Sequence, residues 1–193
     1  MSKILGIIGG GQLGMMITEA AKKMPDHISK IIVLDPVKNC PASQVGAEQI
    51  IADFKDKNAI IELAKRSDII TYEIESGDSD VLKSVENDAE VNPSPETLKI
   101  IQDKFLQKSF LLQNNILVPE FIKIESISDL ERGLKKFGYP SLLKARRDAY
   151  DGRGNFKIDS PKQIQKAFDY FNEKKLMLEK FVPFKMEVSV IAA

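Results

Sequence analysis

The chain of 193 residues is 43% hydrophobic and carries 28 basic and 28 acidic side chains, so its formal net charge is zero. A neutral chain has no overall field to attract nucleic acid or an acidic membrane surface, and we expect neither as a partner. The single cysteine, Cys40, excludes an internal disulfide. No apolar leader and no apolar run of about 18 residues is found, which predicts a cytoplasmic protein.

Short β-branched runs alternate with amphipathic stretches through residues 1–92. In chain order we expect strands in KILGII, KIIVLD, AEQIIAD and SDIITYE, and helices in GQLGMMITEAAKKM and KNAIIELAKR. Strands separated by helices of this length form βαβ units. The sequence therefore predicts an α/β chain that begins with a Rossmann-like domain containing a parallel sheet.

The sequence pattern changes after residue 92. Residues 93–119 open with Pro-Ser-Pro and then keep a helical spacing as far as Asn114 and Asn115, which predicts a helical linker. Residues 120–193 offer strands in EFIKI, PSLLKAR, NFKI, KLMLEKFV and MEVSVIAA, and helices in SISDLERGLKKFG and SPKQIQKAFDYFN. This pattern predicts a small α+β domain with an antiparallel sheet backed by two helices. Because the chain stops within a predicted strand, we expect a truncated polypeptide.

A glycine-rich turn follows the first predicted strand. Gly9, Gly11 and Gly14 satisfy G-x-G-x-x-G between a strand and a helix, where backbone N–H groups and the helix N-terminus favour a phosphate. Asp35 ends the next strand, at the position of a ribose-binding acid in dinucleotide folds. A nicotinamide-dependent oxidoreductase is therefore one interpretation. A tight turn that binds nothing is another, and Gln12 places a polar amide where dinucleotide sites usually have a small or apolar residue.

Acidic residues follow a later strand of the same domain. The stretch DIITYEIES places Thr71, Glu73 and Glu75 on one side of an extended segment. Ligands of open parallel sheets gather at the carboxyl ends of the strands, so these carboxylates should share a crevice with the glycine turn. A ligand with a phosphate at one end and an amine or hydroxyls at the other fits this polarity, as a phosphoribosyl amine does. The alternative is a solvated loop.

A second glycine-containing loop lies in SLLKARRDAYDGRGNF. Lys144 ends an apolar strand, and Gly152 and Gly154 lie in a loop that leads to the next strand. A lysine beneath a flexible loop suits the phosphates of a nucleotide. A hairpin with a basic flank is the alternative interpretation.

An acid interrupts the next apolar strand, in LMLEKFVPFKMEVSV. Glu179 is followed by the backbone of residues 180–182 and then by Glu187. An acid followed by accessible backbone can bind an adenine edge and ribose hydroxyls. A plain edge strand would show the same residues.

Taken in order, these motifs resemble the ATP-grasp superfamily and, within it, the N5-carboxyaminoimidazole ribonucleotide synthetase family. The resemblance covers the whole chain and is carried by GGGQLGMM, ITYEIES, NPSPETLKIIQDKFLQKSFL, YDGRGN and LEKFVPFKMEVSVIAA. A sister family, the formate-dependent glycinamide ribonucleotide transformylases, typically has Glu in place of Gln12 and a serine-rich loop in place of AYDGRGN. The first family is therefore the better match.

The resemblance implies an ATP-dependent carbon–nitrogen ligase of purine biosynthesis. ATP and bicarbonate would give carboxyphosphate and ADP, and the amine of 5-aminoimidazole ribonucleotide would then capture the carboxyl group. It also implies Mg²⁺ and a homodimer. The superfamily's metal-binding acids and catalytic residues are expected beyond Ala193, so we expect the 193-residue chain alone to be inactive.

The resemblance also implies two sets of site residues, and Asp35 would make no more than a minor contact. ATP would be bound by Lys104, Lys144, Tyr150, Asp151, Gly152, Arg153, Gly154, Asn155, Glu179, Lys180, Phe181, Val182 and Glu187. The ribonucleotide would be bound by Gly11, Gln12, Leu13, Glu73, Tyr150 and Arg153. This chain departs from the family before the loop tyrosine, where small residues are common and Arg147, Asp148 and Ala149 stand here.

Overall fold

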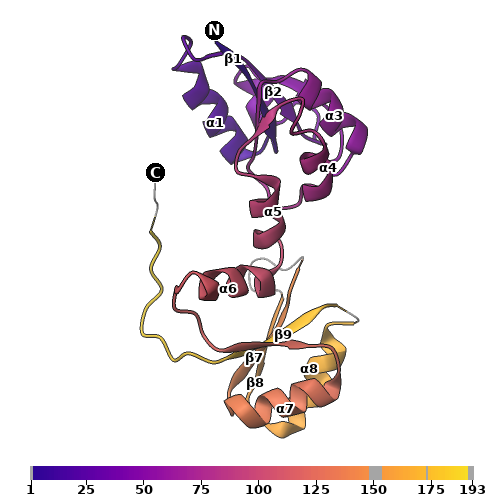
Figure 1. Ribbon diagram of the computed structural model, residues 1–193, viewed down its shortest axis with the longest axis vertical. Helices are drawn as coiled ribbons and strands as arrows, with labels where there is room; N and C mark the ends of the chain where they lie inside the picture. Colours follow the sequence, from indigo (N-terminus) through magenta and orange to yellow (C-terminus); the bar gives the residue numbers. More distant parts are fainter. Residues whose placement is uncertain (1, 148–153, 173, 191–193) are drawn as a thin grey trace. The chain divides into compact units, whose positions relative to one another are not determined.

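The computed structural model describes residues 2–147, 154–172 and 174–190. The chain divides into two compact units, Met1–Ile101 and Gln102–Ala193, and each unit is described by itself (Figure 1). The division falls inside the segment 93–119 that the sequence predicts as a linker. None of the helices in the described ranges has both the length and the apolar character needed to cross a membrane.

Unit 1 is built on a five-stranded parallel sheet. Its strands are β1 (Lys3–Ile8), β2 (Ile28–Leu34), β3 (Glu48–Ile50), β4 (Ile69–Tyr72) and β5 (Glu90–Val91). They lie in the order β3-β2-β1-β4-β5, and each neighbouring pair is parallel. The predicted Rossmann-like sheet is confirmed.

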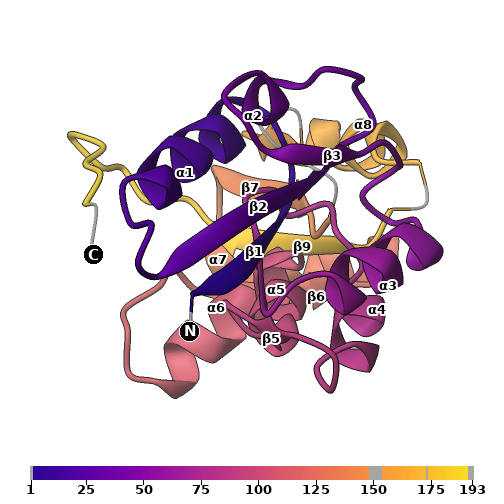
Figure 2. The ribbon, with the colours of Figure 1, turned by 90° about the horizontal axis from the view of Figure 1, so that it is seen from above.

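Helices cover both faces of this sheet (Figure 2). They are α1 (Gln12–Lys22), α2 (Pro41–Gln44), α3 (Lys57–Lys65), α4 (Ser79–Ser84) and α5 (Pro95–Ile101). One buried cluster joins α1 and α2 to Ile7 and Val33, and another joins α3, α4 and α5 to Ile8 and Leu34. Because successive residues of a strand point to opposite faces, β1 and β2 are buried on both sides, which explains their apolar sequences.

Strand β4 ends earlier than the sequence predicts. Its ladder with β1 stops where Tyr72 lies opposite Ile8, because β1 itself ends there and Gly9 turns the chain at a φ of 101°. The backbone then turns at Glu75, and Asp78 caps α4 by accepting two backbone N–H groups. The prediction that Thr71, Glu73 and Glu75 continue along one extended face is therefore wrong at Glu75.

Unit 2 is built on a four-stranded antiparallel sheet. Its strands are β6 (Phe121–Ile124), β7 (Ser141–Ala145), β8 (Asn155–Ile158) and β9 (Leu176–Lys180), in the order β6-β9-β7-β8. Helix α7 (Ile127–Phe137) lies between β6 and β7 in the chain. Helix α8 (Ile164–Tyr170) lies between β8 and β9, directly after a 3₁₀ turn at Pro161–Gln163. The buried cluster that holds Leu143, Leu178 and Ile158 also holds residues of both helices. The predicted α+β unit, an antiparallel sheet backed by two helices, is confirmed.

The segment 93–119 contains two helices where the sequence predicts one. Helix α5 ends at Ile101, and α6 (Lys104–Gln113) begins after Asp103. The side chain of Asp103 accepts the N–H groups of Phe105 and Leu106, which is the bonding of an N-cap residue. A new helix start therefore interrupts the periodic pattern, and α6 packs in unit 2 through an edge-to-face contact between Phe105 and Phe121.

The predicted strand in MEVSVIAA is wrong over the residues that can be described. Residues 186–190 are irregular, and no strand pairing is found for them in the described part of the chain. Met186, Val188 and Val190 are 76% to 89% exposed. The alternating pattern of this segment is that of a strand, but a strand needs a hydrogen-bonded neighbour. Residues 191–193 lie outside the described part.

Candidate functional site

The glycine turn of unit 1 depends on close approaches that other residues would prevent. A Cβ atom on Gly14 would lie 2.2 Å from the carbonyl oxygen of Gly9, so glycine lets α1 start directly against the turn. A Cβ atom on Gly9 would lie 2.7 Å from the Glu73 side chain. The predicted strand, turn and helix are thus present, and the end of β4 lies against the turn.

An acidic side chain of the protein binds the turn at Gly10. Gly10 donates to the carboxylate of Asp35 at 2.7 Å, and Asp35 also accepts the N–H of Val37 at 2.8 Å. Asp35 is 5% exposed. A ribose-binding acid must present its oxygens to the ligand, whereas those of Asp35 hold the turn and the loop after β2. Asp35 is a structural residue, which argues against a dinucleotide site.

Glu73 is the second acid on the turn. A Cβ atom on Gly11 would lie 3.3 Å from its Oε1, so the carboxylate closely approaches the Gly11 backbone. Burial raises the pKa of Glu73 above its ordinary value, the nearby charge of Asp35 raises it further, and the approach of the Gly11 N–H opposes both. A half-buried carboxyl group with a raised pKa at the carboxyl edge of a parallel sheet is typical of a ligand-binding position.

The N-terminus of α1 lies beside Glu73 and is open. Helix α1 follows Gly11, has no side-chain cap and carries no acidic residue in its first turn. Gln12 is exposed, and Leu13 and Met16 are more than half exposed. The four described residues that the sequence assigns to the ribonucleotide therefore gather at one place: Gly11, Gln12, Leu13 and Glu73.

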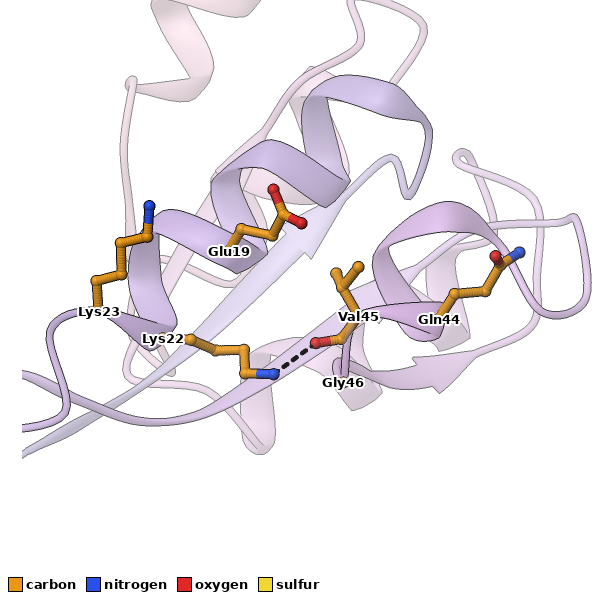
Figure 3. Close-up of a pocket in the computed structure, with 6 residues that line it drawn as sticks. All are labelled: Glu19, Lys22, Lys23, Gln44, Val45 and Gly46. Carbon is orange, nitrogen blue, oxygen red and sulfur yellow. Dashed lines mark hydrogen bonds between the residues drawn. The ribbon is translucent and has the colours of Figure 1, made fainter.

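The other end of α1 carries a shallow depression (Figure 3). Lys22, the last residue of α1, donates from Nζ to the carbonyl oxygen of Val45 at 2.8 Å, with Gly46 beside it. An 11-residue helix is about 16 Å long, so this depression is well separated from the open N-terminus of α1. The Lys22 contact ties the helix to the loop after α2.

In unit 2, a buried carboxylate lies between two lysines. Glu179 on β9 is 6% exposed. Its Oε1 lies 3.0 Å from Nζ of Lys144 on β7, and its Oε2 lies 2.8 Å from Nζ of Lys108 on α6. The Lys108 contact is an ion pair outside hydrogen-bonding angles, and Oε2 accepts no hydrogen bond among the described residues. Lys144 and Glu179, both predicted from the sequence, are therefore brought together.

Two further predicted ATP residues lie close to Lys144 along the sheet. Asn155 is paired with Lys144 across β7 and β8, and the carbonyl oxygen of Gly154 accepts the N–H of Ala145 at 2.9 Å. Lys104 opens α6, and its backbone N–H donates to the carbonyl oxygen of Arg146 at 2.9 Å. Four more residues that the sequence assigns to ATP lie outside the described part of the chain: Tyr150, Asp151, Gly152 and Arg153.

The predicted residues after Glu179 are spread along the surface of unit 2. Lys180 forms an exposed ion pair with Glu120 at 2.7 Å, and the ring of Phe181 lies 5.2 Å from Nζ of Lys157. Val182 and Glu187 are exposed. The expected strand position of Glu187 is wrong, since its segment is irregular, and no contact joins it to the Lys144–Glu179 pair within residues 174–190 and the other described ranges.

Comparison with known proteins identifies both units. Residues 1–102 match the family described as the ribonucleotide synthetase preATP-grasp domain, and residues 109–193 match the ATP-grasp domain. The chain belongs to the ribonucleotide synthetase family of ATP-grasp proteins. Its preATP-grasp and ATP-grasp parts correspond to units 1 and 2.

Relatives of this ATP-grasp chain carry consistent names. It is 44% identical over 191 residues to a phosphoribosylaminoimidazole carboxylase of Schizosaccharomyces pombe, covering 98% of this chain and 34% of that protein. A solved N5-carboxyaminoimidazole ribonucleotide synthetase from Thermotoga maritima is 43% identical with a TM-score of 0.81, covering 95% and 47% of the two chains. An Aspergillus clavatus N5-carboxyaminoimidazole synthase, solved with ADP and 5-aminoimidazole ribonucleotide, is 34% identical with a TM-score of 0.86, covering 96% and 48%.

The chain spans about a third of the first relative and about half of the other two. The names favour the ATP-grasp interpretation over a nicotinamide-dependent oxidoreductase.

Two features of the ATP-grasp unit were not predicted from the sequence. One is Lys108, which pairs with Glu179. The other is the buried pair of Arg146 and Asp103, joined by two hydrogen bonds of 3.0 Å and 2.6 Å, with the guanidinium 4.9 Å from the ring centre of Phe105. Lys108 lies one helical turn after the predicted Lys104, which is the only signal that could have selected it.

A protein site for magnesium needs several oxygen donors close together, chiefly carboxylates. Residues 2–147, 154–172 and 174–190 contain no group of three or more His, Cys, Asp or Glu side chains that could hold a metal ion. These residues do not fit a metal site of their own, so no step below is assigned to a metal.

Proposed function

We propose that this chain contributes the nucleotide-binding and ribonucleotide-binding parts of an N5-carboxyaminoimidazole ribonucleotide synthetase. The reaction transfers the γ-phosphoryl group of ATP to an oxygen of bicarbonate, which gives ADP and carboxyphosphate. The amine of 5-aminoimidazole ribonucleotide then attacks the carboxyl carbon, the bond to phosphate breaks, and phosphate leaves. The observation that carries the proposal is the match of the chain to the preATP-grasp and ATP-grasp families in sequence order.

Unit 2 supplies groups suited to ATP. Lys144 offers a cation near the end of β7, where it can bind the phosphates. Glu179 offers a buried carboxylate with one oxygen that accepts no hydrogen bond among the described residues, which suits the amine of an adenine. The backbone of residues 180–182 follows directly and can bind the rest of the purine edge.

Unit 1 supplies groups suited to a sugar phosphate that carries an amine. The open N-terminus of α1 favours the phosphate group. Glu73 lies against the same turn and can accept a hydrogen bond from an amine or a hydroxyl group. Gln12 adds an exposed side-chain amide to the same place. This combination of groups supports 5-aminoimidazole ribonucleotide as the substrate of unit 1.

Magnesium bound to ATP, a homodimer and a cytoplasmic location remain predictions of the sequence, as do the roles of Tyr150, Asp151, Gly152 and Arg153. Polyphosphates are bound by enzymes together with Mg²⁺, which is the physical reason for expecting the ion.

The experiment is an assay of ADP release by the natural full-length protein. ADP release is expected only when ATP, bicarbonate and 5-aminoimidazole ribonucleotide are all present. Formate with glycinamide ribonucleotide, the substrates of the sister family, should release none. Tight binding of NAD(P) with no binding of ATP in isothermal titration would contradict the proposal.

The Lys144→Ala variant tests the phosphate role of that residue. Removal of a cation that contacts ATP phosphates costs about 2 kcal/mol or more in a partly buried site, which raises the KM for ATP about thirtyfold. Lys166→Ala, on the exposed face of α8, is the matched control and should keep the wild-type KM. Unchanged kinetics of the Lys144 variant would remove that residue from the phosphate site.

A further inference from the structure

Unit 2 contains more positive charge around Glu179 than the carboxylate needs. Lys108 and Lys144 come from different elements, α6 and β7, and approach different oxygens of the same carboxylate at 2.8 Å and 3.0 Å. Both lysine side chains are 18% exposed, and that of Glu179 is 8% exposed. The three groups carry a net charge of +1. A single lysine would neutralise the acid, so the second needs an explanation.

The proposed function supplies a reason for two cations. Lys144 would bind the ATP phosphates, but in the structure its Nζ is hydrogen-bonded to Glu179. When Lys144 turns to the phosphates, Glu179 loses that partner. A buried carboxylate without a cation is strongly unfavourable, so ATP binding would be opposed unless another cation stays with the acid.

We propose that Lys108 is the positioning residue that keeps Glu179 paired while Lys144 binds the phosphates of ATP. This inference rests on the proposed function and deepens it, because it concerns how the same nucleotide site becomes available. Lys108 acts through Glu179 and Lys144 and makes no contact with the reacting atoms.

The position of Lys108 does not depend on Lys144. Helix α6 is fixed at its start by Asp103, which caps the helix and is bonded to Arg146. The Lys104 N–H donates to the Arg146 carbonyl oxygen and adds a backbone connection to the end of β7. Lys108 is therefore held beside Glu179 by the helix that carries it.

The geometry also leaves Glu179 able to accept from a ligand. The contact between Lys108 and Oε2 is an ion pair outside hydrogen-bonding angles, and Oε2 has no hydrogen bond from the described residues. Lys108 thus neutralises the carboxylate while Oε2 stays a hydrogen-bond acceptor that no described residue uses. Lys144, by contrast, forms a hydrogen bond to Oε1 at 3.0 Å.

The experiment measures the dissociation constant of ATP by isothermal titration with the natural full-length protein. Lys108→Met should weaken ATP binding by at least about tenfold, because ATP would have to leave Glu179 unpaired. Lys108→Arg should restore the affinity to within about threefold, since it returns the cation. The kcat at saturating ATP should change far less than the KM, because Lys108 does not contact the reacting atoms.

A double-mutant cycle separates this role from a general effect on the fold. In the Glu179→Gln background no carboxylate needs a cation, so Lys108→Met should change ATP affinity by less than about threefold. Lys30→Met is the matched control, because Lys30 forms an exposed ion pair with Glu48 at 2.6 Å in unit 1, and it should keep wild-type affinity.

The inference is overturned if Lys108→Met binds ATP as tightly as the wild type does. It is also overturned if Lys108→Met weakens ATP binding by the same factor in the Glu179→Gln background. If the wild-type protein binds no ATP, both this inference and the proposed function fail. If it binds ATP but releases no ADP with bicarbonate and the ribonucleotide, only the proposed function fails, and the cycle still decides the role of Lys108. Circular dichroism of Lys108→Met against Lys108→Arg verifies folding.

Discussion

The buried pair of Arg146 and Asp103 should contribute strongly to the stability of unit 2. The guanidinium donates two hydrogen bonds to the carboxylate, and the two residues are 8% and 3% exposed. In Arg146→Met the carboxylate stays buried without the cation that hydrogen-bonds to it, and breaking a buried pair costs about 3 to 5 kcal/mol. Asp103 would still cap α6 through Phe105 and Leu106, so the loss reports on the pair and not on the cap.

Arg147→Met is a matched control for this variant. Arg147 is the neighbouring arginine and approaches the same carboxylate, but at 3.7 Å and with a side chain that is 43% exposed. An exposed pair contributes about 0 to 1 kcal/mol. The two substitutions remove the same charge from adjacent positions and should differ in their cost by 2 kcal/mol or more, on the order of thirtyfold in an equilibrium constant.

Amide hydrogen exchange of the natural full-length protein measures this difference locally. The relevant amides are those of Lys104, which donates to Arg146, and Gln107, which donates to Asp103. Their protection should fall more than about a hundredfold in Arg146→Met and less than about fivefold in Arg147→Met. Equal losses of amide protection in the two variants would refute the reasoning, as would a loss of local stability below about 1 kcal/mol in Arg146→Met.

The pH dependence gives a second measurement on the same pair. Burial alone would raise the pKa of Asp103, but the hydrogen bonds and charge of Arg146, together with the N–H groups of Leu106 and Phe105, lower it below the usual value. A lowered folded-state pKa stabilises the protein above the unfolded value and loses that contribution as pH falls through the folded value. The difference in the free energy of unfolding between the wild type and Arg146→Met should therefore become smaller below about pH 4.

Two further predictions concern unit 1. Burial raises the folded-state pKa of Glu73 above its unfolded value, so its stabilising contribution is present below the unfolded pKa and lost as pH rises through the folded pKa. Glu73→Gln should therefore have a higher melting temperature than the wild type at neutral pH and nearly the same melting temperature below about pH 4. A lower melting temperature of Glu73→Gln at neutral pH would contradict the raised pKa. Gly14→Ala places a Cβ atom 2.2 Å from the Gly9 carbonyl oxygen and should lower the free energy of unfolding, measured in urea, by about 1 to 3 kcal/mol. Gly77→Ala places its Cβ atom 3.6 Å from the Leu98 side chain, and its free energy of unfolding should stay within about 0.5 kcal/mol of the wild type.

Local patterns were enough to predict the two sheets and most of their elements. The run KILGII became β1, and SISDLERGLKKFG became α7, which begins after its Ser126 cap and ends before Gly138. The errors occur where a local pattern needed a partner or met a cap. Residues 186–190 have the alternation of a strand but no pairing in the described chain, and Asp103 starts a second helix inside one periodic run.

The candidate site was predicted in part, because motifs select residue types but not their contacts. Lys144 and Glu179 could be chosen from the sequence, since a lysine before a glycine loop and an acid in an apolar strand both suggest a nucleotide. Asp35 looked like a ribose-binding acid from its spacing alone. In the structure its carboxylate binds the Gly10 N–H at 2.7 Å, which no spacing rule could have predicted.

By itself the sequence determined the order of the elements, the glycine turn and the family, because these depend on periodicity and on short motifs. Only the tertiary structure decided which charges meet. Lys108, Lys144 and Glu179 come from three elements far apart in the chain, and the antiparallel register with the packing of α6 brings both lysine Nζ atoms within 3.0 Å of the Glu179 carboxylate. Coulomb interactions depend on distance and burial, and both exist only after the chain has folded.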